Sequence, residues 1–418
     1  MNDVQSYERR SYAALLSSVF CSSAALALLT TVLGKQVYDL THSPLALGLL
    51  GLAEFAPAAI LVFVTGTLAD RIDRRKLAAV ALAVQASSIA CLAWYAGTSP
   101  TSTVPIFGLV VAFGTGAAFA APATRALPSD LVTAGRLPWL VARQNATSQG
   151  ASIVGPVVGG FLYVINIRLP YVTGAVLVVV SACAILLVRP RHTAASASGP
   201  RAGIRDAAEG VRFVRSQPVL LGTISLDLFA VLFGGAVALL PAIAETRLDV
   251  GAVGLGFLRA AVGIGAGAVT LFLTRRPVTR QVGRTLFIAV AVFGIGTIAL
   301  GATTSFAVAF VALVALSGAD SISVYIRSTL VPLATPQNMR GRVLAIESVF
   351  IGASNELGAF ESGVAGQLLG APAAIVLGGG ATLAIASFWW IAFPALRTVD
   401  HFPVPVENPV RPAPDPRT

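Results

Sequence analysis

Five ionisable side chains stand inside long stretches of this sequence that are otherwise apolar. They are Glu54, Asp227, Arg259, Asp320 and Glu356, and Glu361 follows about a turn and a half after the last of them. A charge inside a membrane is costly unless it is paired, neutral or hydrated, so such residues mark functional sites. We therefore expect these six side chains to line a cavity that couples protons to a substrate.

Asp227 is our first candidate for the proton-coupling residue, because its segment places it near the midplane of a bilayer. Arg259 would either neutralise it or hold an anionic substrate, and Glu356 and Glu361 are the next candidates. Any single acid could instead be a protonated or salt-bridged packing residue. The set favours a functional role, because the third, sixth, ninth and twelfth apolar segments contain none.

The elements that must position these residues are membrane-spanning helices. Charged residues make up 11% of the chain and apolar ones 56%, and the mean hydropathy is +0.80. A spanning helix needs roughly 20 apolar residues. We expect an all-α polytopic membrane protein with spans at 12–37, 45–69, 77–97, 104–127, 140–165, 169–188, 218–244, 251–274, 282–301, 306–331, 343–369 and 373–396.

Basic residues collect in alternate connections, which predicts the topology. With both termini in the cytoplasm, the Lys and Arg residues that fall elsewhere are Lys35, Arg168, Arg247 and Arg259. The net charge of +10 therefore indicates contact with anionic membrane lipid and excludes nucleic acid as a partner. We expect a multi-pass protein of the bacterial inner membrane.

The three cysteines and three histidines do not form a site. Cys21, Cys91 and Cys183 fall at unrelated depths, and His42, His192 and His401 fall in connections or in the tail. No disulfide framework, metal site or nucleophile–base pair is predicted, and we expect no cofactor and no enzyme.

The chain contains an internal repeat. Shifting the sequence by 202 residues aligns 116–152 with 318–354 at nine identical positions without a gap, which predicts two six-helix halves related as parallel repeats. The predicted organisation is a cytoplasmic N-terminus (1–11), a first bundle (12–188), a linker with an amphipathic helix lying against the inner leaflet (189–217), a second bundle (218–396) and a disordered tail (397–418).

Two motifs in the first half predict a mechanism of conformational change. The connection after the second span interleaves a glycine, acids and arginines, which favours a cytoplasmic gate. Its members are Gly66, Asp70, Arg71, Asp73, Arg74 and Arg75, with Asp130 as a partner for Arg71 or Arg74. The fifth span combines a helix-bending proline with small residues that permit close packing, at Gly150, Gly155, Pro156, Gly159 and Gly160.

These motifs resemble those of the major facilitator superfamily: the charged connection is similar to its loop signature, and the fifth span to its antiporter motif. Segments 121–132, 226–229, 238–242, 335–343 and 354–358 resemble the enterobactin-exporter branch. The resemblance implies proton-driven efflux of a catecholate siderophore or another amphipathic molecule, in the manner of multidrug exporters, by a monomer. A facilitator-type importer or uniporter and a non-transporting receptor or scaffold stay open as alternatives.

Overall fold

The computed structural model describes residues 2–188, 204–337 and 339–403, without the side chains of 2–9, 62–64, 66, 67, 69–71, 134 and 204–208. The described residues form helices and no strands. The helices are α1 (Asn2–Thr41), α2 (Pro44–Arg71), α3 (Arg74–Ala96), α4 (Val104–Leu131), η1 (Ala134–Arg136), α5 (Leu137–Ile165), α6 (Arg168–Leu187), α7 (Ile204–Ser216), α8 (Pro218–Phe233), η2 (Ala236–Leu239), α9 (Leu240–Thr246), α10 (Gly251–Arg275), α11 (Val282–Ala302), α12 (Phe306–Leu333), α13 (Arg340–Leu369), α14 (Ala371–Ala392) and α15 (Pro394–Arg397).

Twelve segments of the described chain are long and apolar enough to cross a membrane, which confirms the predicted all-α membrane fold. Several of these helices carry a proline in their first turn, where its missing N–H breaks no helical hydrogen bond. An even number of spans puts both chain ends on one side of the bundle. We call this side the terminal face and the opposite side the far face.

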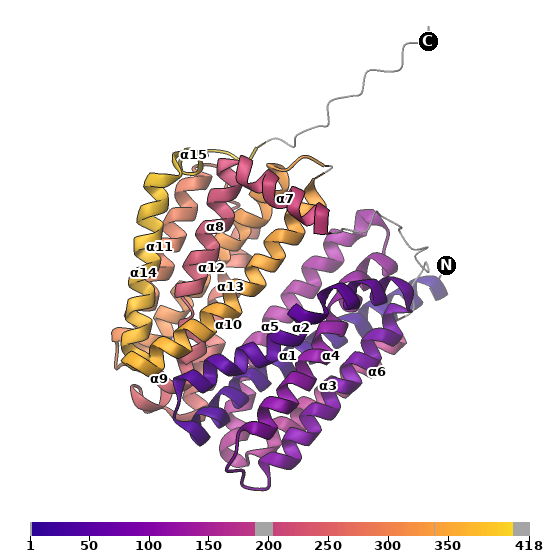
Figure 1. Ribbon diagram of the computed structural model, residues 1–418. Coiled ribbons are helices and arrows are strands. Elements are labelled where there is room, and N and C mark those ends of the chain that lie inside the picture. Colours follow the sequence, from indigo (N-terminus) through magenta and orange to yellow (C-terminus); the bar gives the residue numbers. More distant parts are fainter. Residues whose placement is uncertain (1, 189–203, 338, 404–418) are drawn as a thin grey trace.

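The helices form two bundles that correspond to the predicted halves (Figure 1). The first half consists of α1–α6, and the second half of α8–α14 with η2. The 202-residue repeat is visible in the helix bounds, because α4 and α12 begin and end at positions that differ by that offset. The two halves meet mainly where α5 packs along α10 and where α2 packs along α13.

The seventh span differs from the expected continuous helix. It is divided into α8, η2 and α9, with an interruption at Gly234 and Gly235. A Cβ on Gly235 would lie 2.6 Å from the carbonyl oxygen of Gly358. The chain therefore leaves the helix where its backbone comes close to α13, on the cavity side of the second half.

The linker helix and the chain end pack differently from the prediction. The amphipathic helix α7 is present, but Val214 belongs to a buried cluster with Leu220, Val331 and Val343 rather than facing lipid. Residues 397–403 are also folded, since the N–H groups of α11 at Val282 and Gly283 donate to the chain at 399–400. Residues 189–203 and 404–418 lie outside the described part of the chain.

Candidate functional site: a charged cavity between the two halves

A cavity of about 510 Å³ lies between the two halves. The first half contributes residues of α1 and α2, and the second half contributes α8, η2, α10, α11, α12 and α13. Five of the six predicted residues line it: Glu54, Asp227, Arg259, Asp320 and Glu356. Glu361 is half-buried on α13 and is not part of the lining.

Several spans contribute no residue to the cavity lining, among them α4 and α5 of the first half. Residues of α3, α6 and α14, which are the third, sixth and twelfth spans, do not appear in the lining. The ninth span, α11, contributes the ring of Phe293. Of these four spans, α11 is the one that reaches the cavity, through this aromatic side chain.

Asp227 forms a buried ion pair whose partner the sequence did not reveal. Its Oδ2 lies 2.8 Å from Nη1 of Arg327 on α12. The two residues are only 6% and 4% exposed, so the pair is almost completely removed from water. The predicted partner, Arg259, is wrong for this state of the protein, because α12 rather than α10 brings a guanidinium to Asp227.

Arg259 instead belongs to a second group of charges. Its guanidinium lies beside Gly34 of α1, where an added Cβ would be 3.6 Å from Nη2. The carboxylate that acts on it is Glu54 of α2, and its buried Nε has no hydrogen-bond partner. A cation of the second half is therefore balanced by an anion of the first half.

Glu356 completes this second group from α13. A Cβ on Gly51 of α2 would lie 2.9 Å from its Oε2. The carboxylate therefore packs directly against the backbone of α2, where the glycine has no side chain. It also interacts electrostatically with Glu54. Protonation or ligand binding here would act directly on the contact between the two halves.

Two buried charged residues near Asp227 were missed by sequence reasoning. Arg327 was assigned to a basic connection because it precedes the end of its span by only a few residues. Glu347 follows the start of α13 by two turns, and it is 7% exposed. The available signal was helical phase: Arg327 is two turns beyond Asp320, so the two share one face of α12.

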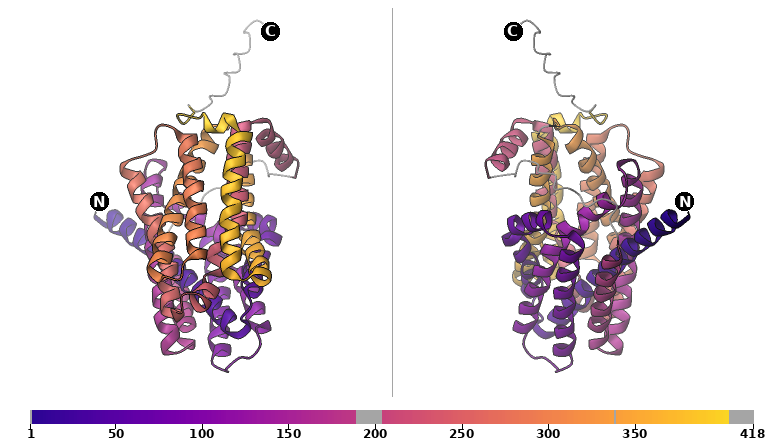
Figure 2. Two further views of the ribbon diagram at one scale, coloured as in Figure 1. Left: turned by 90° about the vertical axis from the view of Figure 1, so that its left-hand side faces the viewer. Right: turned by 90° about the vertical axis from the view of Figure 1, so that its right-hand side faces the viewer.

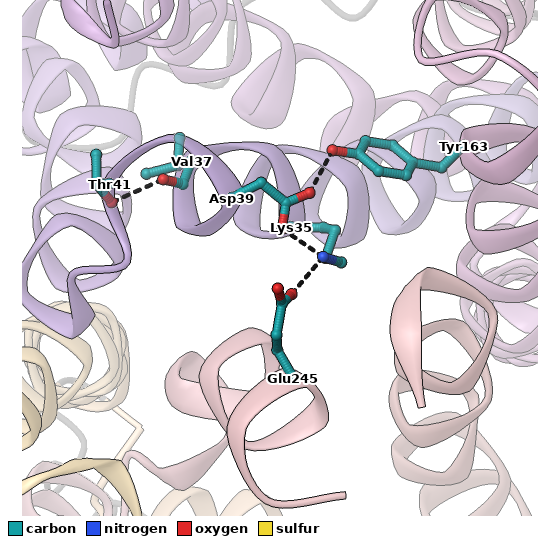
Figure 3. Close-up of polar contacts among 6 residues, drawn as sticks. All are labelled: Lys35, Val37, Asp39, Thr41, Tyr163 and Glu245. Atoms are coloured by element: carbon teal, nitrogen blue, oxygen red, sulfur yellow. Dashed lines mark hydrogen bonds and ion pairs between the residues drawn. The ribbon is translucent and has the colours of Figure 1, made fainter. Parts of the chain in front are cut away.

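On the far face, a network of hydrogen bonds and ion pairs connects the halves (Figure 3). We call it the far-face network and define it as Lys35 and Asp39 of α1, Tyr163 of α5 and Glu245 of α9. The ammonium of Lys35 donates to both carboxylates, and the Tyr163 hydroxyl donates to Asp39 over 2.7 Å.

Further contacts close the same face. Ser43 donates to the Gln367 side chain over 2.7 Å, and Tyr38 and Leu47 of the first half belong to a buried apolar cluster with η2 and α9. The sequence had placed Lys35 on the outer side but gave no partner for it. The two halves are thus joined by polar and apolar contacts at the far face.

The predicted gate residues lie on the terminal face. Arg74 donates to both oxygens of Asp130, at 2.9 and 3.0 Å. Asp73 accepts from the backbone N–H of Arg75 at the start of α3, and the hydrogen bonds and charge of Arg75 lower the pKa of the Asp73 carboxyl. Gly66 belongs to α2, and the side chains of Asp70 and Arg71 lie outside the described part of the chain. Both of the described pairs remain within the first half.

The predicted antiporter motif lies at two helix contacts. A Cβ on Gly155 would come within 2.6 Å of the Ala24 carbonyl oxygen in α1, and one on Gly160 within 2.5 Å of the Ala252 carbonyl oxygen in α10. Gly159 faces Leu28 and Val32, while Gly150 has no neighbour within 4 Å of such a Cβ. The close approach of α5 to both α1 and α10 requires the first two glycines.

The sequence profile of the Major Facilitator Superfamily matches residues 15–346 of this chain. The chain is 24% identical over 352 residues to the enterobactin exporter EntS of Shigella flexneri, which covers 79% of each protein. Its fold resembles that of a bacterial homologue of the human lysosomal transporter Spinster in an inward-facing, occupied conformation, with a TM-score of 0.69 and 16% identity over 94% of this chain and 96% of the other.

A POT-family transporter in complex with a thioalcohol-conjugated peptide has the same fold, with a TM-score of 0.72 and 12% identity over 93% of this chain and 96% of that transporter. These relatives are transporters rather than enzymes, which agrees with the prediction from the sequence. By the extent of the profile match and by its twelve-span fold, this chain is a member of the Major Facilitator Superfamily.

Proposed function

We propose that the protein exports an amphipathic small molecule, with a catecholate siderophore as the first candidate, in exchange for protons. The observation that carries the proposal is the buried Asp227–Arg327 pair in the wall of the cavity between the halves. The carboxyl can gain and lose a proton there, and the same cavity can hold a solute. The terminal face would lie in the cytoplasm of a bacterium.

Alternating access accounts for the unequal contacts at the two faces. The far-face network and the apolar cluster with Tyr38 and Leu47 join the halves. Toward the terminal face the helices of the two halves diverge (Figure 1). The cavity would therefore receive its cargo from the cytoplasmic side in this state, and a rocking motion would break the far-face network to release it outside.

Asp227 would carry the proton through this cycle. With the far face open, it would bind a proton from outside, which neutralises the carboxylate and weakens its pairing with Arg327. With the terminal face open, the proton would leave to the cytoplasm and the pair would form again. Cargo and proton would then use the same cavity in alternate half-cycles, which is the requirement for exchange.

The outward direction and the cargo class are supported by the α5 motif and by the relatives. The motif contacts both α1 and α10, so it lies at the joint between the halves rather than in a single bundle. The curated relatives that match 79% of the chain are named as enterobactin exporters. The resemblance of the motif to the antiporter motif of the superfamily and the names of the relatives favour export over import or facilitated diffusion.

Transport into inverted membrane vesicles tests the proposal. We expect an acidic lumen to drive accumulation of radiolabelled iron-free enterobactin, or of ethidium as an amphipathic alternative. Asp227→Asn should lower gradient-driven accumulation by at least about tenfold while leaving exchange of labelled for unlabelled cargo in place. Glu361→Gln, which changes a carboxyl outside the cavity lining, is the matched control and should transport normally.

Normal gradient-driven accumulation by a well-inserted Asp227→Asn protein would remove this residue from the coupling mechanism. Accumulation driven by an alkaline lumen instead would indicate an importer that moves cargo together with protons.

A further inference from the structure

Three buried carboxyls interact electrostatically with Arg327, namely Asp227, Asp320 and Glu347, and it forms an ion pair with the first of them. Nη1 contacts Asp227 at 2.8 Å, while Nε is buried without a hydrogen-bond partner. Glu347 of α13 lines the same small crevice as Asp227 and Arg327. It interacts electrostatically with both of them.

Glu347 has no role in the transport cycle described so far. It is 7% exposed, it does not line the main cavity, and the structure shows no hydrogen bond from its carboxyl to any described residue. A buried carboxyl beside a guanidinium with unused donors is costly unless the two groups pair in some state of the protein.

The need for such a pairing follows from the proposed function, on which this inference rests. When Asp227 takes up a proton, Arg327 loses the anion that balances it and would remain as an unpaired charge in a nearly dry site. A second carboxyl within reach of the guanidinium removes this penalty. Protonation of Asp227 then becomes easier by the free energy that the new pair contributes.

We propose that Glu347 is a positioning residue that accepts Arg327 whenever Asp227 is protonated. The guanidinium of Arg327 exchanges one carboxylate for the other as the proton moves between the aqueous phase and Asp227, and Glu347 is charged when it pairs with Arg327. Arg327 is in this way a two-position switch: it pairs with Asp227 when that carboxyl is charged and with Glu347 when Asp227 is protonated.

The charged groups around this switch are few. From α12 it is approached by Asp320, which interacts with Arg327; from α2 the described side chains contribute Glu54, which belongs to the Arg259 group. The α7 helix contributes Glu209, which is paired with Arg342 of α13 at 2.8 Å. The sequence of α14 contains no charged residue. Glu347 is therefore the unpaired carboxylate that faces Arg327 from α13.

A pH titration of the conformation tests this proposal without knowledge of the cargo. Spin labels at Thr101→Cys and Thr304→Cys, on exposed far-face connections of the two halves, would report the distance between them in lipid nanodiscs, with Cys21, Cys91 and Cys183 replaced by serine. We expect the midpoint of the pH-dependent change to move to lower pH by about one unit or more in Glu347→Gln, because Asp227 is harder to protonate when Arg327 has no second partner.

Glu347→Asp keeps the charge, so its midpoint pH should lie close to that of the wild type. This variant carries the test if the glutamine variant does not fold. Glu361→Gln, a neutralised carboxyl on the same helix outside the cavity lining, should leave the midpoint unchanged. An unmoved midpoint in Glu347→Gln would overturn the proposal while proton coupling stands. A wild-type protein whose distances do not respond to pH at all would overturn both this inference and the proposed function.

Discussion

The two halves have the same helical framework but very different polar interiors. Arg125 and Arg327 occupy equivalent positions of the repeat on α4 and α12. Arg327 is buried against Asp227, whereas Arg125 is exposed. The position in the first half that corresponds to Asp227 is Ala25, which is completely buried in an apolar cluster.

The other charges of the second half are also missing from their repeat-equivalent positions. Asp320 corresponds to Ala118, Glu347 to Asn145 and Glu356 to Val154. The first half instead holds the charged connection before α3, the α5 motif and one cavity acid, Glu54. In the proposed mechanism the two halves would therefore have different roles: the first half would provide helix contacts and a gate, and the second half would provide most of the groups that bind protons.

Removing the guanidinium from each half would test this division most strongly. Arg327→Gln should destabilise the protein by about 3–5 kcal/mol, because it leaves Asp227 buried without a counter-charge. Arg125→Gln, at an exposed position, should change stability by less than about 0.5 kcal/mol. Thermal unfolding of both variants in detergent would measure the difference. Equal losses would contradict the contrast between the halves.

The far-face network is the polar joint between the halves, and breaking it should have an intermediate effect. Lys35→Ala removes bonds to Asp39 and Glu245, and should shift the balance toward an open far face by about 1–2 kcal/mol, or roughly 5- to 30-fold. Distances between labels at positions 101 and 304 would report the shift.

Arg247→Ala is the control for Lys35→Ala. Arg247 is a cation on the same face, and its guanidinium donates to the backbone carbonyls of Ala302 and Thr303 within the second half. Its removal should leave the distance distribution unchanged. A shift of equal size in both variants would mean that loss of charge, rather than loss of the contact between halves, opens the face.

The smallest effect is expected at the terminal face, where Asp73 caps α3 within the first half. Asp73→Ala should cost about 1 kcal/mol. Because Arg75 lowers the pKa of Asp73, this contribution should be complete above the ordinary Asp pKa of about 4 and disappear as the pH falls through the lowered value in the folded state. Unfolding midpoints of wild type and variant, measured from pH 7 downward, should therefore converge in acid. A constant difference would argue against the pairing.

Much of the fold could be predicted from the sequence, because apolar length and the distribution of arginines are one-dimensional signals. The interruption at Gly234 and Gly235 could not, since the residues on both sides of it are apolar and only the approach of Gly358 reveals the reason for it. The contact of the linker helix with the second half through Val214 could not be predicted for a similar reason. An amphipathic face fits a membrane surface and the end of a helical bundle equally well.

The acidic residues of the candidate site could be predicted from the sequence, but the residues with which they pair could not. Glu54, Asp227 and Asp320 stand out because they interrupt apolar spans. Arg327 and Glu347 lie near the ends of their spans, where charged residues are ordinary, and only helix tilt and phase turn them inward. Of the two roles predicted for Arg259, pairing with Asp227 is not observed, because sequence order does not determine which helices are neighbours across the cavity.

The central claim is that protonation of Asp227 in the second half controls which face is open. The most direct test is the distance between labels at Thr133→Cys and Arg276→Cys, on terminal-face connections of the two halves, measured in nanodiscs at acidic and alkaline pH. The account predicts that this distance differs between acidic and alkaline pH in the wild type, and that Asp227→Asn shows the acidic distribution at every pH. A distance that does not depend on pH, or an Asp227→Asn protein that still responds as the wild type does, would contradict it.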